Sequence, residues 1–116
     1  MNPILEYKNN KWEVMEDLSF QWFNTDIVVP KGFRTDLASV PRIFWSIYPP
    51  FGRYNGACVV HDYLYTTHAL ARIECDLILR AIMRKNRVSK VTRNIFYIMV
   101  RLFGGGHYKK FRKNVN

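Results

Sequence analysis

GRYNGACVVHDYLYTTHALARIECDLILRAIMRK, residues 52–85, decides the fold because it carries two helical patterns separated by a short polar break. The first pattern predicts a helix from about Tyr54 to Thr66, and the second predicts a helix from about Ala69 to Lys85. Because only a few residues join them, the two helices should pack antiparallel with their apolar faces together.

Each of these helices carries one ionisable residue on an apolar face. His61 recurs at helical spacing with Ala57, Leu64 and Tyr65. Asp76 falls on a stripe with Ile73, Leu79 and Met83. A carboxylate in such a seam is costly unless it is paired or hydrogen-bonded. We therefore expect Asp76 to meet His61, with the Tyr65 hydroxyl able to join them.

The pair has two interpretations. A carboxylate bonded to one imidazole nitrogen fixes the tautomer and raises the basicity of the other nitrogen, which is the arrangement of a general base. His61, Asp76 and Tyr65 are then candidate catalytic residues. Alternatively, the two side chains only satisfy each other inside the core.

Two further acids are candidate metal ligands. Asp62 directly follows His61, and its oxygens suit a divalent cation, with calcium the first choice and zinc the second. Asp36, in the loop RTDLAS (residues 34–39), can reach into the same site or bond the local backbone as a turn or capping residue. Asp62 can equally be an exposed surface acid. The two cysteines, Cys58 and Cys75, are expected to be buried free thiols.

The rest of the chain places strands before helices. Short β-type segments at Lys11–Met15, Leu18–Trp22 and Asp26–Val29 predict a small antiparallel sheet or hairpin. A short helix at Pro41–Ile47, capped by Ser39, should follow. A third long helix should begin at Ser89 and end at Phe103, before three glycines, with the core-facing stripe Val91, Ile95, Ile98 and Leu102. The prediction is one α+β domain over residues 1–108, with a basic tail at 109–116.

Charge is unevenly distributed. The formal net charge is +9 among 116 residues, and no acid follows Asp76. Residues 80–116 contain eleven lysines and arginines. Such a field attracts anionic lipid, envelope polymers or nucleic acid, although it also serves as a solvated face. We expect no signal peptide and no transmembrane segment, because the start of the chain lacks an apolar region and the longest apolar run is short.

Two resemblances add to this interpretation. The runs VPKGFRTDLASVPRIFW (29–45), GRYNGACVVHDYLY (52–65) and CDLILRAIM (75–83), with RLFGG (101–105), resemble the bacteriophage and prophage family called domain of unknown function 1353. That resemblance covers roughly residues 26–108 and implies a phage or prophage origin, with the protein in the host cytoplasm or incorporated in the virion, among other phage proteins.

The second resemblance is local. Cys58-x-x-His61-Asp62-x-x-Tyr65 is similar to the active-site helix of secreted phospholipase A2 enzymes. It implies His61 as the base, Asp76 as its orienting acid, Asp62 as a calcium ligand and Tyr65 as a network partner. The glycine-rich calcium loop and the disulfide framework of those enzymes are missing: SVPRIFWSIYPPFG (39–52) stands in the place of the loop.

Three functions remain open on these grounds. The first is a small hydrolase that acts on a host envelope substrate through His61 and Asp76. The second is a non-enzymatic phage virion or accessory protein in which the pair is structural. The third is a nucleic-acid-binding module that uses the basic C-terminal third, although no recognised binding motif is present.

Overall fold

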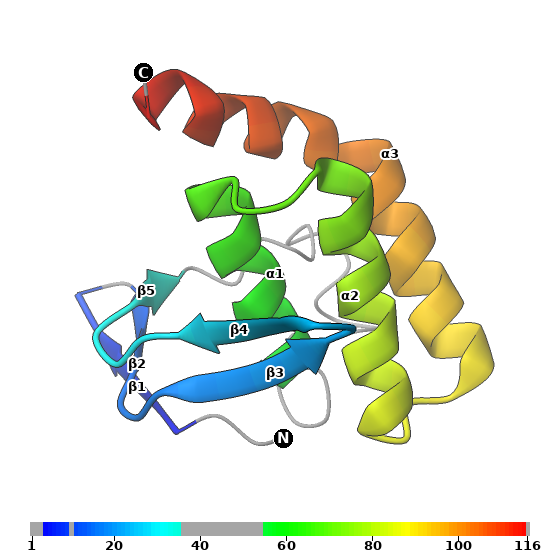
Figure 1. Cartoon of the computed structure of the whole chain (residues 1–116), viewed down its shortest axis with the longest axis horizontal. Coiled ribbons are helices and arrows are strands. Elements are labelled where there is room, and N and C mark those ends of the chain that lie inside the picture. The colour runs from blue at the N-terminus through cyan, green and yellow to red at the C-terminus, as the bar shows by residue number, and fades with distance from the viewer. Residues whose placement is uncertain (1–3, 10, 36–54, 116) are drawn as a thin grey trace.

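The computed structural model describes residues 4–9, 11–35 and 55–115 (Figure 1). Within these residues, strands precede helices, as the sequence predicted. The strands are β1 (Leu5–Lys8), β2 (Lys11–Val14), β3 (Leu18–Trp22), β4 (Thr25–Val29) and β5 (Arg34–Thr35). The helices are α1 (Asn55–Thr67), α2 (Arg72–Lys85) and α3 (Lys90–Val115). The architecture is α+β.

The strands form two small antiparallel sheets. One has the order β1-β2-β5, and the other is the hairpin β3-β4. The sequence predicted β2, β3 and β4 but missed β1, which is short and largely exposed, and β5, which has only two residues. Although β2 and β3 are neighbours in sequence, they belong to different sheets.

The hairpin supplies most of the sheet side of the core, to which β2 adds Val14. Its buried side chains alternate with exposed ones, so one face packs inward. The inward residues are Leu18, Phe20, Ile27 and Val29. They join the buried residues of the helices in one continuous apolar cluster. The sheets therefore provide a platform against which the helices pack.

Helices α1 and α2 lie side by side and run in opposite directions, as expected from the four residues between Thr67 and Arg72 (Figure 1). The face of α1 that carries His61 is buried, as predicted. The predicted stripe of α2 was partly wrong. Ile73 is 43% exposed, while the buried face of α2 is made by Cys75, Asp76, Ile78, Leu79, Ile82 and Met83.

The predicted end of the third helix was also wrong. Instead of stopping at Phe103, α3 continues through Gly104–Gly106 to Val115. Figure 1 shows α3 rising beside α2 and then crossing over the end of α1. Residues 109–115 therefore continue this helix.

The core face of α3 differs from the predicted stripe as well. Val91, Ile98 and Leu102 are 69%, 54% and 70% exposed, whereas Phe96, Met99 and Val100 are buried. Both sets are spaced for one helical face, so periodicity alone could not choose between them. The choice depends on which face meets α2.

Two predicted features, the helix Pro41–Ile47 with its cap Ser39 and the loop acid Asp36, lie outside the described residues. Among the residues that the structure describes, no helix is long and apolar enough to cross a membrane.

Candidate functional site

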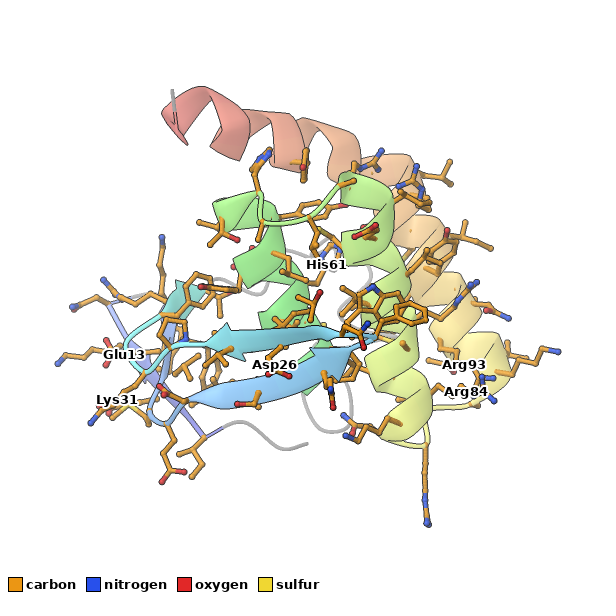
Figure 2. All side chains as sticks on the ribbon, viewed as in Figure 1. Glu13, Asp26, Lys31, His61, Arg84 and Arg93 are labelled. Atoms are coloured by element: carbon orange, nitrogen blue, oxygen red, sulfur yellow. The ribbon has the colours of Figure 1, made fainter. Side chains whose placement is uncertain are left out.

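His61 and Asp76 meet where the three helices converge. His61 comes from the middle of α1 and Asp76 from the first half of α2, and both side chains are buried. Figure 2 shows His61 among the helices, away from Glu13 and Lys31 on the sheet side. The predicted proximity is present: His61 Nε2 lies 2.7 Å from Asp76 Oδ1.

Asp76 is the centre of a hydrogen-bond cluster. Its Oδ1 accepts a hydrogen bond from the Tyr65 hydroxyl at 2.5 Å in addition to the contact with His61. Its Oδ2 accepts from Arg101 Nη1 at 2.8 Å. Both oxygens of the buried carboxylate are thus satisfied, which removes most of the cost of burying them.

The cluster keeps Asp76 ionised. Burial acts to raise the pKa of Asp76, but hydrogen bonds from His61, Tyr65 and Arg101, together with the charge interaction with His61, outweigh burial and hold the pKa below its ordinary value. The hydrogen bond to Asp76 in turn raises the pKa of the Arg101 guanidinium. The carboxylate therefore acts only as an acceptor near neutral pH.

That charge state fixes the tautomer of His61. Because an ionised carboxylate has no proton to donate, the short contact requires His61 Nε2 to carry the proton and donate it to Asp76. In the neutral imidazole, Nδ1 then holds the lone pair. The nitrogen with acceptor capacity is thus the one that Asp76 does not contact.

Tyr65 links the pair to a second arginine. Burial, and next the hydrogen bond to Asp76, raise the pKa of the Tyr65 hydroxyl, so it remains a donor. Its oxygen accepts from Arg72 Nε at 3.3 Å. Arg72 also donates to the carbonyl oxygens of Val100 and Arg101 at 2.8 and 2.7 Å. The site is therefore fastened to the backbone of α3.

The glycines of α3 make this close approach possible. A Cβ added at Gly104 would lie 2.8 Å from the Tyr65 hydroxyl oxygen, closer than real side chains come. At Gly106 an added Cβ would meet nothing within 4 Å. The clash at Gly104 explains why a residue that disfavours helices stands inside α3.

The predicted cation ligands are not brought together in the described part of the chain. Asp62 is buried beside His61 on α1, and Asp36 lies outside the described residues. Within residues 4–9, 11–35 and 55–115, no three His, Cys, Asp or Glu side chains gather as a metal ion requires. These residues alone do not fit a calcium or zinc site.

Neither Cys58 nor Cys75 forms a disulfide, and both are buried, as expected. Burial, with a smaller contribution from Asp62, raises the pKa of Cys58 to about 12. Burial and then Asp76 raise the pKa of Cys75 to about 12. Both therefore remain protonated thiols near neutral pH.

Sequence reasoning missed both arginines of the cluster. Arg72 precedes Asp76 by four residues on a helix, which is a recognisable ion-pair spacing. Arg101 has no such local signal, because it lies 25 residues after Asp76 and reaches it only through the packing of α3 on α2.

These features define a small α+β protein with a buried His–Asp pair on two antiparallel helices. The chain belongs to the family described as "Protein of unknown function (DUF1353)", whose model matches residues 12–100. The match contains every member of the cluster except Arg101, which follows it directly.

One curated relative extends the comparison. The "Uncharacterized protein y4jT" of Sinorhizobium fredii (strain NBRC 101917 / NGR234) is 35% identical over 96 residues, which represent 80% of this chain and 29% of y4jT. The chain thus spans less than a third of that relative. No solved structure matches this chain significantly.

Proposed function

We propose that this protein is a small hydrolase in which His61, oriented by Asp76, is the general base. The observation that carries the proposal is the 2.7 Å contact between His61 Nε2 and an ionised Asp76. A neutral histidine held in one tautomer by a buried carboxylate is the arrangement that general-base hydrolysis uses.

In the proposed reaction, His61 first accepts a proton and later returns it. Nδ1 of His61 takes a proton from water as the water oxygen attacks the carbonyl carbon of an ester or amide. The resulting imidazolium is stabilised by Asp76, which Arg101 and Tyr65 hold in place. The imidazolium then returns the proton to the leaving oxygen or nitrogen as the carbon–heteroatom bond breaks.

A divalent cation, calcium before zinc, remains part of the proposal only as an additive to be tested. Asp62 offers one carboxylate next to the base, and further ligands would have to come from outside the described residues, where Asp36 lies. The proton transfer at His61 does not depend on it.

The substrate class we propose is a host envelope component, in keeping with a phage or prophage origin. Support comes from α3, whose exposed Val91, Ile98 and Leu102 share one helical face in a segment without acidic residues. Apolar side chains on a basic helix suit an anionic lipid surface. Mass spectrometry of purified virions from a strain carrying the gene tests the association with phage particles.

The proposal is tested by hydrolysis assays on phosphatidylglycerol vesicles and on peptidoglycan, each with calcium, zinc or a chelator. His61→Ala and Asp76→Asn are compared with Asp26→Asn, which removes an exposed strand carboxylate. We expect activity in the wild type and in Asp26→Asn, and a loss of roughly 10²- to 10⁴-fold in folded His61→Ala. Absence of hydrolysis by the wild type under every condition contradicts the proposal.

A non-enzymatic accessory or virion protein is the second candidate function. It is favoured by the contacts of Arg72 and Arg101, which join Asp76 and Tyr65 to α3 in the manner of a structural cluster. In that case His61→Ala and Asp76→Asn lower the free energy of unfolding, while no substrate is turned over by any variant.

A further inference from the structure

A second feature lies apart from the His61 cluster, in a groove between α2 and α3. The groove encloses about 560 Å³. Its lining residues come from the end of β3, from α2 and from the start of α3. We call this feature the α2–α3 groove, and its lining residues are Trp22, Leu77, Arg80, Ala81, Arg84, Lys90, Arg93 and Asn94. Figure 2 shows Arg84 and Arg93 close together on this side of the molecule, away from His61.

The α2–α3 groove is strongly cationic. Four of its lining residues are lysine or arginine and none is acidic. Within the described part of the chain, none of these four cations forms an ion pair with a carboxylate. Like charges that share a groove repel each other, and a polyanion relieves this repulsion.

Two of the arginines are held in position by other groups. The Arg80 guanidinium lies 4.2 Å from the centre of the Tyr97 ring. Arg93 Nη1 donates to the carbonyl oxygen of Val88 at 3.2 Å. Arg84 and Lys90 are exposed. The groove thus combines two arginines that other groups hold in position with two exposed cations, all of which can donate charge-assisted hydrogen bonds to anionic oxygens.

The groove lining includes one member of an aromatic pair. Trp22 is a lining residue, and the ring of Phe23 packs edge-on against it with centroids 4.7 Å apart. Phe23 is 80% exposed and has a φ of 53° in the two-residue connection between β3 and β4. This left-handed position favours glycine or asparagine, so the backbone conformation does not account for the exposed phenylalanine there.

From the cationic groove and this aromatic pair, we propose that the α2–α3 groove binds single-stranded nucleic acid. Arg80, Arg84, Lys90 and Arg93 contact successive phosphates, and Phe23 with Trp22 stacks against a base. This combination is the general means by which proteins hold single strands without sequence preference. A lipid surface fits the groove less well, because the exposed aliphatic residues of α3 are not among its lining residues. The inference is independent of the chemistry at His61.

The test is fluorescence anisotropy of a labelled oligo-dT with the full chain at several salt concentrations. If four phosphates are contacted, the logarithm of the binding constant should fall against that of salt with a slope of about −2.8, at roughly −0.7 per phosphate. Arg84→Ala/Lys90→Ala should halve that slope. Lys8→Ala/Lys11→Ala is the matched control, because it removes two exposed charges from β1 and β2 and should behave as wild type.

The aromatic residue is tested by Phe23→Asn, which suits the left-handed φ and keeps the turn. Its affinity should fall about fivefold or more, since stacking of one base contributes at least that factor. The proposal is overturned if oligo-dT does not bind at low salt, or if the groove and control variants lose affinity equally. Binding to phosphatidylglycerol vesicles that depends on the groove, without oligo-dT binding, also overturns it.

Discussion

At the scale of single residues, Asp76 is the residue on which the site depends. It is fully buried, yet it accepts hydrogen bonds from His61, Tyr65 and Arg101. The three donors come from α1 and α3, so the charge of Asp76 links its own helix to two others. The same charge stabilises the fold and orients His61. Removing that charge should therefore alter stability and its pH dependence together.

The pH dependence has a definite sign. The pKa of Asp76 in the folded protein lies below its unfolded value, so the unfolded chain binds the proton more readily. The stability contributed by Asp76 is complete above the unfolded pKa of about 4. It is lost as the pH falls through the lower folded pKa.

We expect Asp76→Asn to lower the free energy of unfolding by roughly 2–4 kcal/mol near neutral pH, because Arg101 loses its counter-charge and two donors lose a charged acceptor. Urea unfolding between about pH 3 and pH 7 measures this difference. The gap between wild type and variant should narrow in acid. A gap that stays constant across this range would show that the charge of Asp76 contributes no stability.

At the scale of elements, α3 depends on a small residue at Gly104. A Cβ added at Gly104 would lie 2.8 Å from the Tyr65 hydroxyl oxygen, whereas one added at Gly105 would lie 3.6 Å from Arg72 Nη1, an ordinary contact distance. Glycine lowers the stability of a helix by about 1 kcal/mol relative to alanine. At Gly104 that cost is offset by the contacts that α3 makes with the cluster.

The glycines of α3 therefore differ in their response to alanine. Gly104→Ala should lower the free energy of unfolding, because its Cβ must displace the Tyr65 hydroxyl from Asp76. Gly106→Ala should raise it by about 0.5–1 kcal/mol, since nothing lies near the added carbon. Thermal unfolding of the two variants measures the contrast. Equal stabilisation by both would contradict the close packing of α3 on Tyr65.

The two faces of α3 give a further prediction. Phe96 is fully buried, and Phe96→Ala should cost about 3–5 kcal/mol of unfolding free energy. Ile98 is 54% exposed, and Ile98→Ser should change stability by about 0.5 kcal/mol or less. Chemical denaturation of both variants distinguishes the faces. If Ile98→Ser lowered the free energy of unfolding more than Phe96→Ala did, the face of α3 that carries Ile98 would be the buried one, contrary to this structure.

Much of this element structure follows from the sequence. The short break after Thr67 predicted two antiparallel helices, and the strand pattern of Leu18–Trp22 predicted the hairpin strand β3. The three glycines after Phe103 led to a wrong prediction of where α3 ends, because glycine commonly ends helices. Only the position of Tyr65 on another helix shows why Gly104 belongs inside one.

At the scale of the whole molecule, charge and chemistry occupy different regions. The N-terminal strands, which carry as many basic as acidic side chains, form the sheets. The His61 cluster lies where the helices converge, and the α2–α3 groove holds four cations between α2 and α3. The excess of positive charge after Asp76 was evident in the sequence. Its concentration in one groove depends on α3 packing beside α2 and on the β3–β4 hairpin contributing Trp22.

The candidate site, too, was only partly predictable from the sequence. His61, Asp76 and Tyr65 were found because they interrupt or border apolar faces on adjacent helices. Arg101 was not, since nothing near it in the sequence indicates a partner 25 residues away. Local periodicity identifies which groups must be paired, whereas tertiary packing decides which group completes the pairing.

General-base chemistry at this site depends on the tautomer of His61, which can be measured directly. Long-range proton–nitrogen NMR correlations, recorded in mildly alkaline buffer, identify which ring nitrogen carries the proton. The account predicts a proton on Nε2, donated to Asp76, and a lone pair on Nδ1, with Asp76→Asn weakening this preference. A wild-type His61 protonated on Nδ1 alone would contradict the account, because Nδ1 is the nitrogen assigned as the base.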